Sequence, residues 1–250
     1  MRAHEAGALH AEVGTRGPAW LRTPGDVNAL LPQLWPRTVT RDGAGVLTVG
    51  GLPAAALAAE FGTPVYVLDE ADFRARCREF AESFGDAELF YAGKAFICKA
   101  IVRILAEEGL SLDVCTGGEL AVALAAGMPP ERIGLHGNNK SVGELERAVR
   151  AGVGRIVVDS FQEIDRLTAI ARRLGTRPRV MVRVTVGVEA HTHEYIATAH
   201  EDQKFGFSLS GGAAKAATQR ILDEGVLELR GLHSHIGSQI FDTDAFEVAA

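Results

Sequence analysis

The sequence has few of the features that place a protein in a specialised class. Its 250 residues include three cysteines, Cys77, Cys98 and Cys115, without metal-like spacing and with one left over from any disulfide scheme. This usage fits a reducing compartment. Aromatic residues make up only 6% of the chain, and the formal net charge is −6 at pH 7. With no basic tract or aromatic stacking series, neither nucleic acid nor anionic lipid is an expected partner.

Long hydrophobic runs are lacking as well. The N-terminal stretch MRAHEAGALHAEVG contains charges and no apolar core of signal-peptide length, and no later window is apolar enough to span a bilayer. The sequence therefore predicts a soluble cytoplasmic protein with no membrane partner. Its 47% hydrophobic content is enough for a sizeable core, in one large domain or parts of two.

What the chain does contain is a repeated βα unit. Candidate strands begin near Glu88, Leu110, Arg132 and Gly154, a period of about 22 residues that suits a strand, a turn and a short helix. These strands end at the polar residues Lys94, Asp113, His136 and Asp159. Two further units lie near Arg179 to Val186 and Glu228 to His235, and they bring Arg183 and His235 to similar places. A parallel barrel carries its chemistry on this rim. An open, doubly wound sheet uses the same units, so the repeat alone leaves both architectures open.

Helix boundaries support the repeat independently. Glycines that suit left-handed helix C-caps follow the helical stretches, at Gly109, Gly127, Gly152, Gly175 and Gly225. Capping boxes are predicted at three helix starts, Thr116/Glu119, Ser141/Glu144 and Ser160/Glu163.

The N-terminal part has a different composition. Residues 1 to about 45 are rich in proline and weakly periodic, and a poorly ordered start is expected there. Strands at Leu47–Val49 and Val65–Leu68 and helices at Ala54–Phe61 and Glu70–Phe84 are predicted to follow. Farther along, the interval Gly187 to Leu209 is too long for a plain connection and is a candidate lid or site loop, with a mobile lid predicted at His191 to His200.

Lys94, within YAGKAF, is the sharpest single candidate for chemistry. A lysine just after an apolar strand can point its amine into a partly desolvated barrel mouth. Desolvation lowers the pKa of an amine and leaves it nucleophilic, as Schiff-base chemistry requires. The alternative is a lysine that extends its amine to solvent from a strand end.

Five motifs in order resemble those of diaminopimelate decarboxylases, particularly the actinobacterial members. They are YAGKAF, DVCTGGEL, HGNNKS, KFGFS and HSHIGSQIFD. The resemblance, which runs from about Trp35 to the last residue, implies a (β/α)8 barrel of the alanine-racemase-like type, a second β-rich domain, and pyridoxal 5'-phosphate as cofactor. It also implies loss of CO2 from meso-diaminopimelate to give L-lysine, with a homodimer as the complete enzyme.

The same resemblance implies roles for individual residues. Lys94 would form the Schiff base with the cofactor, and His235 would stack on the cofactor ring. Asp113 would lie near the lysine and exchange protons with it, and Ser238 would contact the cofactor phosphate. His136 and Asn138 would line the rim more loosely. Gly93 departs from the family's pattern, where alanine is common, a change expected to loosen the strand end slightly.

Several of these residues have structural alternatives. Asp113 could cap the helix that starts after Thr116. Arg183 could form an ion pair inside the barrel instead of contacting a ligand. His233 is predicted to be a buried barrel residue. A rival metal site at His191, His193, Glu194 and His200 lacks a further spaced ligand set, so no metal is expected.

The six βα units that can be recognised in the sequence are too few for an eight-stranded barrel. We therefore expect an N-terminal extension with the start of the β-rich domain at residues 1–45 and an incomplete barrel at residues 46–250. The family's glycine-rich phosphate loop, its Glu-Pro-Gly-Arg segment and its Cys-Glu-Ser motif have no counterpart before Ala250. Two alternatives to the decarboxylase remain: another pyridoxal-phosphate amino-acid decarboxylase or racemase of the same fold, and an inactive barrel fragment.

Overall fold

The computed structural model describes residues 26, 28–32, 34–187, 205–237 and 243–250, with only the backbone of Ala245. The chain divides into two compact units, residues 1–73 and 74–250. Ser238 and the rival metal residues His191, His193, Glu194 and His200 lie outside the described residues, as does most of the predicted lid. The division predicted above, between residues 45 and 46, stays a prediction.

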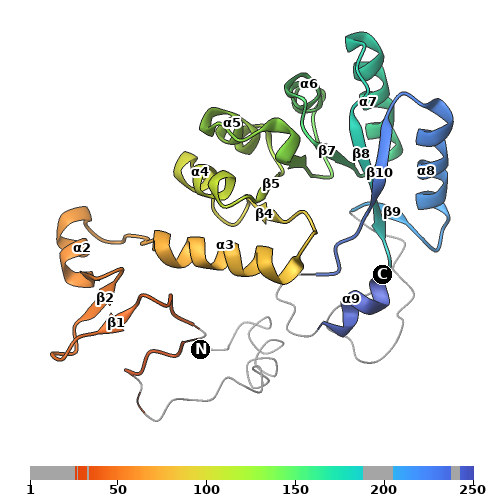
Figure 1. Ribbon diagram of the computed structural model, residues 1–250. Helices are drawn as coiled ribbons and strands as arrows, with labels where there is room; N and C mark the ends of the chain where they lie inside the picture. Colours follow the sequence, from red (N-terminus) through yellow and green to blue (C-terminus); the bar gives the residue numbers. More distant parts are fainter. Residues whose placement is uncertain (1–25, 27, 33, 188–204, 238–242) are drawn as a thin grey trace, which may run out of the picture. The chain divides into compact units, whose positions relative to one another are not determined.

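A seven-stranded parallel sheet forms the centre of the second unit (Figure 1). Its strands are β4 (Phe90–Ala92), β5 (Ser111–Val114), β6 (Ile133–Leu135), β7 (Arg155–Val158), β8 (Arg179–Thr185), β9 (Phe207–Ser208) and β10 (Glu228–His233). The order is β4-β5-β6-β7-β8-β10, and β9 pairs with β8. The predicted succession of parallel strands is thus confirmed.

Strand order decides between the two architectures that the repeat left open. A doubly wound sheet reverses its order at a switch point. Here the main path runs in one direction along the chain, as in a barrel, and only the short β9 lies off it. Among the described residues no pairing joins β4 to β10, so within these residues the sheet is open.

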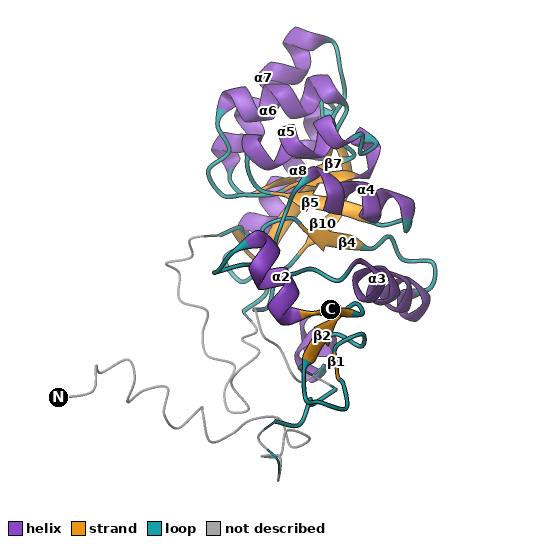
Figure 2. Cartoon of the chain, turned by 90° about the vertical axis from the view of Figure 1, so that its left-hand side faces the viewer, coloured by secondary structure: helices purple, strands orange, loops and turns teal. Residues whose placement is uncertain are grey.

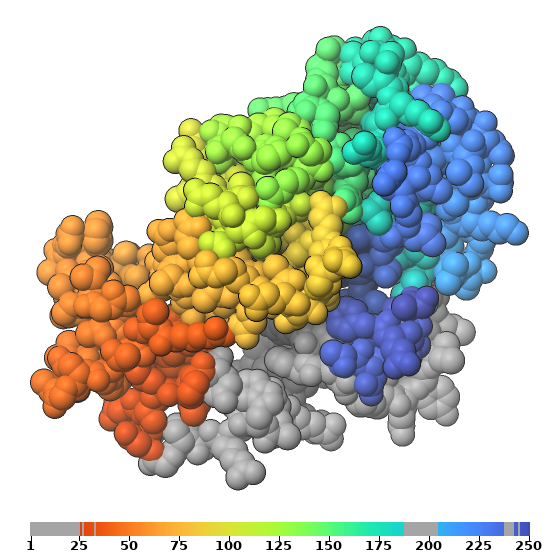
Figure 3. All heavy atoms as spheres, viewed as in Figure 1, coloured from red at the N-terminus to blue at the C-terminus, as the bar shows by residue number. Residues whose placement is uncertain are grey.

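Helices alternate with the strands and cover one face of the sheet (Figure 2). They are α4 (Lys99–Glu107), α5 (Gly117–Ala126), α6 (Val142–Ala151), α7 (Phe161–Leu174) and α8 (Ala213–Glu224), and a short 3-10 helix, η1 (Pro130–Arg132), precedes β6. Figure 3 shows their atoms packed side by side in chain order. Leu105, Leu120, Leu145 and Leu167 point inward from four of these helices and are fully buried. This layer is the hydrophobic core of the unit.

The two faces of β8 differ. Val180, Val182 and Val184 are buried, whereas Met181 and Arg183 on the other face are only partly buried. Successive side chains of a strand point to opposite faces, so the valines pack under the helices and Arg183 faces the inner side of the sheet. Polar side chains at the strand ends are therefore available for chemistry.

Local capping follows the sequence closely, with one exception. The capping boxes Thr116/Glu119 and Ser141/Glu144 are both complete. At α7 the Ser160 hydroxyl accepts from Glu163 N at 3.2 Å, but the Glu163 carboxylate accepts from Asp159 N at 3.1 Å instead of from Ser160 N. The third predicted box is therefore wrong in its second half.

The first unit contains a small antiparallel sheet of β1 (Thr40–Arg41), β2 (Leu47–Val49) and β3 (Leu52–Pro53). It is followed by α2 (Ala54–Phe61) and by α3 (Glu70–Phe84), which continues into the second unit. The predicted strand at Val65–Leu68 is wrong. These residues are exposed, with Tyr66 at 104% exposure, and pair with no other strand in the described part of the chain. A β pattern without a ladder partner does not form a strand.

A short helix, α9 (Asp244–Ala249), is the last described element. No helix of the described chain has the length and apolarity needed to cross a lipid bilayer.

Candidate active site

The carboxyl ends of the parallel strands bring the predicted site residues to one rim. Lys94 follows β4 and is exposed, and Asp113 lies within β5. His136 directly follows β6, and Arg183 and His233 lie near the ends of β8 and β10. Adjacent parallel strands end side by side, which is why residues separated by 20 or more positions meet here. Gly93 N donates to Asp113 O at 2.8 Å and ties the start of the Lys94 turn to β5.

Asp113 and His136 are in direct contact. His136 Nε2 lies 3.1 Å from Asp113 Oδ1, although no aligned hydrogen bond joins the two atoms. Burial raises the pKa of Asp113 from 3.8 to about 7, against the lowering effect of the Lys94 charge. Burial and the neighbouring cations lower the pKa of His136 from 6.5 to about 3. Although the distance suggests an ion pair, His136 is neutral near pH 7 because its pKa is so far below that value.

The alternative role for Asp113, a helix cap, is excluded. Thr116 is the N-cap of α5, and its side chain accepts from Glu119 N. The Asp113 side chain instead faces His136 and, through its Oδ1, remains a buried acceptor without a hydrogen-bond partner among the described residues.

His233 extends the cluster through a contact with the His136 ring. The two rings form an edge-to-face contact with centroids 4.7 Å apart. The sequence predicted a buried His233, and the structure shows a partly buried one. Its Nδ1 atom is buried and has no hydrogen-bond partner among the described residues. Burial, followed by the charge of Arg183, lowers the pKa of His233 to about 4.

Arg183 is held from two sides. Its guanidinium lies 3.8 Å from Asp159 Oδ1 and 4.5 Å above the centre of the Phe205 ring. The ion pair that the sequence left as an alternative is therefore present. The same positive charge lowers the pKa of His136, His233 and His235, although burial is the larger cause in each case.

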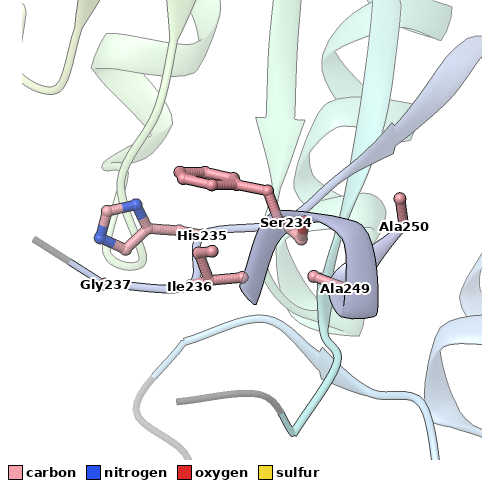
Figure 4. A pocket seen from close by; sticks show the side chains of 7 residues that line it. Ser234, His235, Ile236, Gly237, Ala249 and Ala250 are labelled. Atoms are coloured by element: carbon pink, nitrogen blue, oxygen red, sulfur yellow. The ribbon is translucent and has the colours of Figure 1, made fainter. Parts of the chain in front are cut away.

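His235 lies beyond the end of β10 and is exposed. Its segment lines a hollow of about 160 Å3 with Ser234, Ile236, Gly237, Phe246, Ala249 and Ala250. Figure 4 shows the imidazole of His235 and the side chain of Ala250 at opposite ends of this segment. Burial lowers the pKa of His235, and the charges of Arg183 and Lys94 act in the same direction.

Asn138 lies two residues beyond His136 and is partly buried. Sequence reasoning missed Lys140, in the loop after β6, and its pairing with Glu163, a residue of α7 that was predicted only to cap that helix. Lys140 Nζ lies 2.7 Å from Glu163 Oε1, with both side chains buried. Asp159, singled out only as a strand end, accepts from Gly206 N at 3.0 Å and orients Arg183. The sequence offered only Lys140 within HGNNKS and Glu163 within the predicted capping box, with nothing to pair the two.

Chemically, the rim combines an exposed amine, a carboxyl group with a pKa near neutrality, neutral imidazoles and a guanidinium. Such a set can bind an anionic ligand and move protons at neutral pH. A family model described as "Pyridoxal-dependent decarboxylase, pyridoxal binding domain" matches residues 70–250. The chain belongs to the pyridoxal-dependent decarboxylases.

Known members of this family are similar over much of the chain. Diaminopimelate decarboxylase of Mycobacterium leprae is 58% identical over 253 residues, which cover 100% of this chain and 54% of that protein. The Mycobacterium tuberculosis enzyme is 63% identical over 222 residues, 88% of this chain and 50% of that one. The chain thus spans about half the length of the curated relatives it matches.

Solved structures agree on the fold. Diaminopimelate decarboxylase from M. jannaschii in complex with L-lysine superposes with a TM-score of 0.75 at 32% identity, over 84% of this chain and 50% of that one. The predicted fold class, the α/β barrel of this family, is confirmed.

The rim fits the cofactor that this family of decarboxylases binds. Two buried polar atoms, Asp113 Oδ1 and His233 Nδ1, have no hydrogen-bond partner among the described residues. Lys94 is exposed on the same rim and acts electrostatically on Asp113. Buried polar atoms normally have partners, so orphaned ones on the same rim as an exposed amine indicate room for a polar ligand.

Proposed function

We propose that the chain supplies the pyridoxal binding part of a diaminopimelate decarboxylase. In the proposed reaction, meso-2,6-diaminopimelate loses CO2 and becomes L-lysine, the last step of lysine biosynthesis. The observation that carries the proposal is the rim itself, where Lys94, Asp113 and His136 lie at or just beyond the carboxyl ends of three adjacent parallel strands. Identity of 58% over the whole chain to a diaminopimelate decarboxylase supports the same substrate.

In this proposal Lys94 would hold pyridoxal 5'-phosphate through its amine, and His235 would pack against the ring. When bound, the pyridine ring supplies an electron sink for the charge left by departing CO2. Ser238 is proposed to contact the phosphate, and Asn138 to line the rim.

Asp113 is proposed to hold or deliver a proton at Lys94 Nζ. Its pKa of about 7 means that both protonation states are populated at neutral pH. A group in this state can accept and return a proton with little cost in free energy. His136 accompanies it as a neutral partner, since the imidazole stays unprotonated down to about pH 3.

The substrate is tested by parallel assays in a polypeptide that spans the full length of the relatives. CO2 release is measured with meso-diaminopimelate, ornithine, arginine and alanine, and racemisation is measured with alanine. A preference of about 100-fold or more in kcat/KM for meso-diaminopimelate is expected, because its distal charged group must be matched by polar contacts. Higher kcat/KM with another substrate would replace the proposal by the related decarboxylase or racemase, and no turnover with any would support an inactive protein.

A homodimer in the cytoplasm completes the proposal. The three free cysteines, Cys77, Cys98 and Cys115, support a reducing compartment. Light scattering of the full-length polypeptide gives its molar mass directly, and a monomer at micromolar concentration with full activity would contradict the dimer.

A further inference from the structure

The Lys140 ammonium group is enclosed at the end of the sheet. The residue is 3% exposed, and its Nζ donates to the carbonyl oxygens of Gly137 and Val157, the latter at 2.8 Å. The remaining side of the group faces Glu163 Oε1 at 2.7 Å, a charged contact without the alignment of a hydrogen bond. Lys140 thus joins the loop after β6 to the carboxyl-terminal half of β7.

Glu163 extends the same connection to Arg183. It is 4% exposed, and its second oxygen accepts from Asp159 N at 3.1 Å. The Asp159 carboxylate in turn accepts from Gly206 N and lies 3.8 Å from the Arg183 guanidinium. This use of Glu163 replaces the capping box that the sequence predicted for α7.

A buried ion pair is a poor source of net stability. Removing two charges from water costs several kcal/mol per ion, and apolar residues of similar volume often stabilise a protein equally or better. Burial raises the pKa of Glu163 even with Lys140 beside it, which reflects this desolvation cost. Val157, whose carbonyl oxygen accepts from Lys140, and Leu167, on the same helix as Glu163, are almost fully buried, so apolar side chains are compatible with this layer. The pair is therefore better explained by the loop conformation that it fixes than by a gain in stability.

The loop that Lys140 contacts carries His136. His136 N donates to Val114 O at 2.8 Å, and this bond anchors the residue to β5. The next residue, Gly137, has a φ of +117°, and a Cβ there would lie 3.3 Å from Cys115 O. Glycine in this region has many accessible conformations. The bond from Lys140 to Gly137 O selects one of them and so limits where the His136 ring can lie.

We propose that Lys140 and Glu163 are positioning residues that hold the His136 ring between Asp113 and His233. Without them the Gly137 turn gains freedom, and the His136 ring leaves its contact with His233. The effect on turnover rests on the proposed decarboxylase function, in which Asp113 and His136 act together. The placement of the ring does not depend on it.

The test separates stability from position. In the 250-residue chain, with histidine labelled by 13C, the nuclear Overhauser effect between the His136 and His233 rings reports their 4.7 Å contact. The double variant Lys140→Met/Glu163→Leu removes both charges and keeps apolar volume. We expect it to melt within a few degrees of the parent, because apolar replacements are tolerated at such sites. Since the signal falls with the sixth power of distance, a displacement of about 1 Å lowers it roughly threefold.

The chosen signal also avoids an electrostatic artefact. Removing the Lys140 charge would by itself raise the pKa of His136, which also responds to its other neighbours, namely Asp113, His233, Arg183 and Lys94. A ring-to-ring distance has no such dependence. The matched control is Arg173→Met/Glu146→Leu, which removes an ion pair with an exposed arginine, 2.7 Å between charged atoms, and should leave the ring signal unchanged.

A folded double variant with the parent's ring signal would overturn the proposal. If the double variant does not fold, the unmodified chain decides. Its Lys140 ammonium group should give a slowly exchanging 15N signal with couplings across hydrogen bonds to the carbonyl carbons of Gly137 and Val157. A rapidly exchanging ammonium group without these couplings would equally overturn it. Neither experiment uses cofactor or substrate, so failure here is distinct from failure of the decarboxylase assignment.

Discussion

His136 Nε2 and Asp113 Oδ1 lie 3.1 Å apart, yet their shifted pKa values describe a neutral imidazole beside a carboxyl group that keeps its proton up to about pH 7. Burial is the larger cause of both shifts, and it disfavours whichever form is charged. Burial on this rim thus favours the uncharged forms of two groups that would form an ion pair in water.

Their opposite shifts predict how stability depends on pH. Asp113 contributes stability that is full below its ordinary pKa of 3.8 and is lost as pH rises to about 7. His136 contributes stability that is full above 6.5 and is lost as pH falls toward 3. Between about pH 4 and 6.5 the two slopes oppose each other and nearly cancel.

Asp113→Asn should leave the His136 slope uncompensated. The free energy of unfolding should then fall more steeply in the variant than in the parent as pH drops from 6.5 to 4, by up to about 1.4 kcal/mol per pH unit. Urea unfolding at several pH values measures this, with the exposed Asp223→Asn as control. Parallel curves for Asp113→Asn and the parent would show that Asp113 has an ordinary pKa.

Lys94 should be the residue that carries the cofactor. After incubation with pyridoxal 5'-phosphate and reduction with borohydride, peptide mapping of the full-length enzyme should place the pyridoxyl group on Lys94. Lys94→Ala should lose the visible absorbance and about 99.9% or more of the activity, as expected for loss of a covalent attachment site. Lys99→Ala, an exposed lysine at the start of α4, is the control. Label on any lysine other than Lys94 would refute the assignment.

The two histidines of HSH should differ in their effects. His235 is exposed at the rim, so His235→Ala should weaken retention of pyridoxal phosphate about tenfold or more while leaving the melting temperature unchanged. His233 is partly buried against His136, so His233→Ala should lower the free energy of unfolding by about 1–2 kcal/mol. Equilibrium dialysis and urea unfolding of both variants check this. Unchanged cofactor retention and turnover in His235→Ala would count against its role.

Gly154 should tolerate no side chain. A Cβ on this residue would lie 1.9 Å from Glu131 O, so the backbone of η1 and the backbone just before β7 must move apart. Gly154→Ala should destabilise the chain by about 2–3 kcal/mol. Gly143→Ala in α6, where a Cβ meets nothing within 4 Å, should be neutral or stabilise slightly. Equal unfolding midpoints for the two variants would contradict the close approach.

Short-range features of the fold could be read from the sequence. The strands at β4 to β8 and β10, the helices Ala54–Phe61 and Glu70–Phe84, and the capping boxes at Thr116 and Ser141 lie where the residues predict them. Hydrophobic period and capping chemistry act within a few residues, so local sequence contains the information. The rim residues Lys94, Asp113 and His136 were found for the same reason, because each ends a legible strand.

Tertiary structure decided the rest. Val65–Leu68 has a strand's composition but no partner strand in the described chain, and the barrel-like strand order was open until pairing was known. Glu163 has the spacing of a capping residue, yet its carboxylate meets Lys140, because the loop after β6 lies against α7, where Arg166 also donates to Lys140 O. The neutral state of His136 likewise comes from burial, a property of the packed rim. Pairing and desolvation depend on residues distant in the chain, so no local pattern contained them.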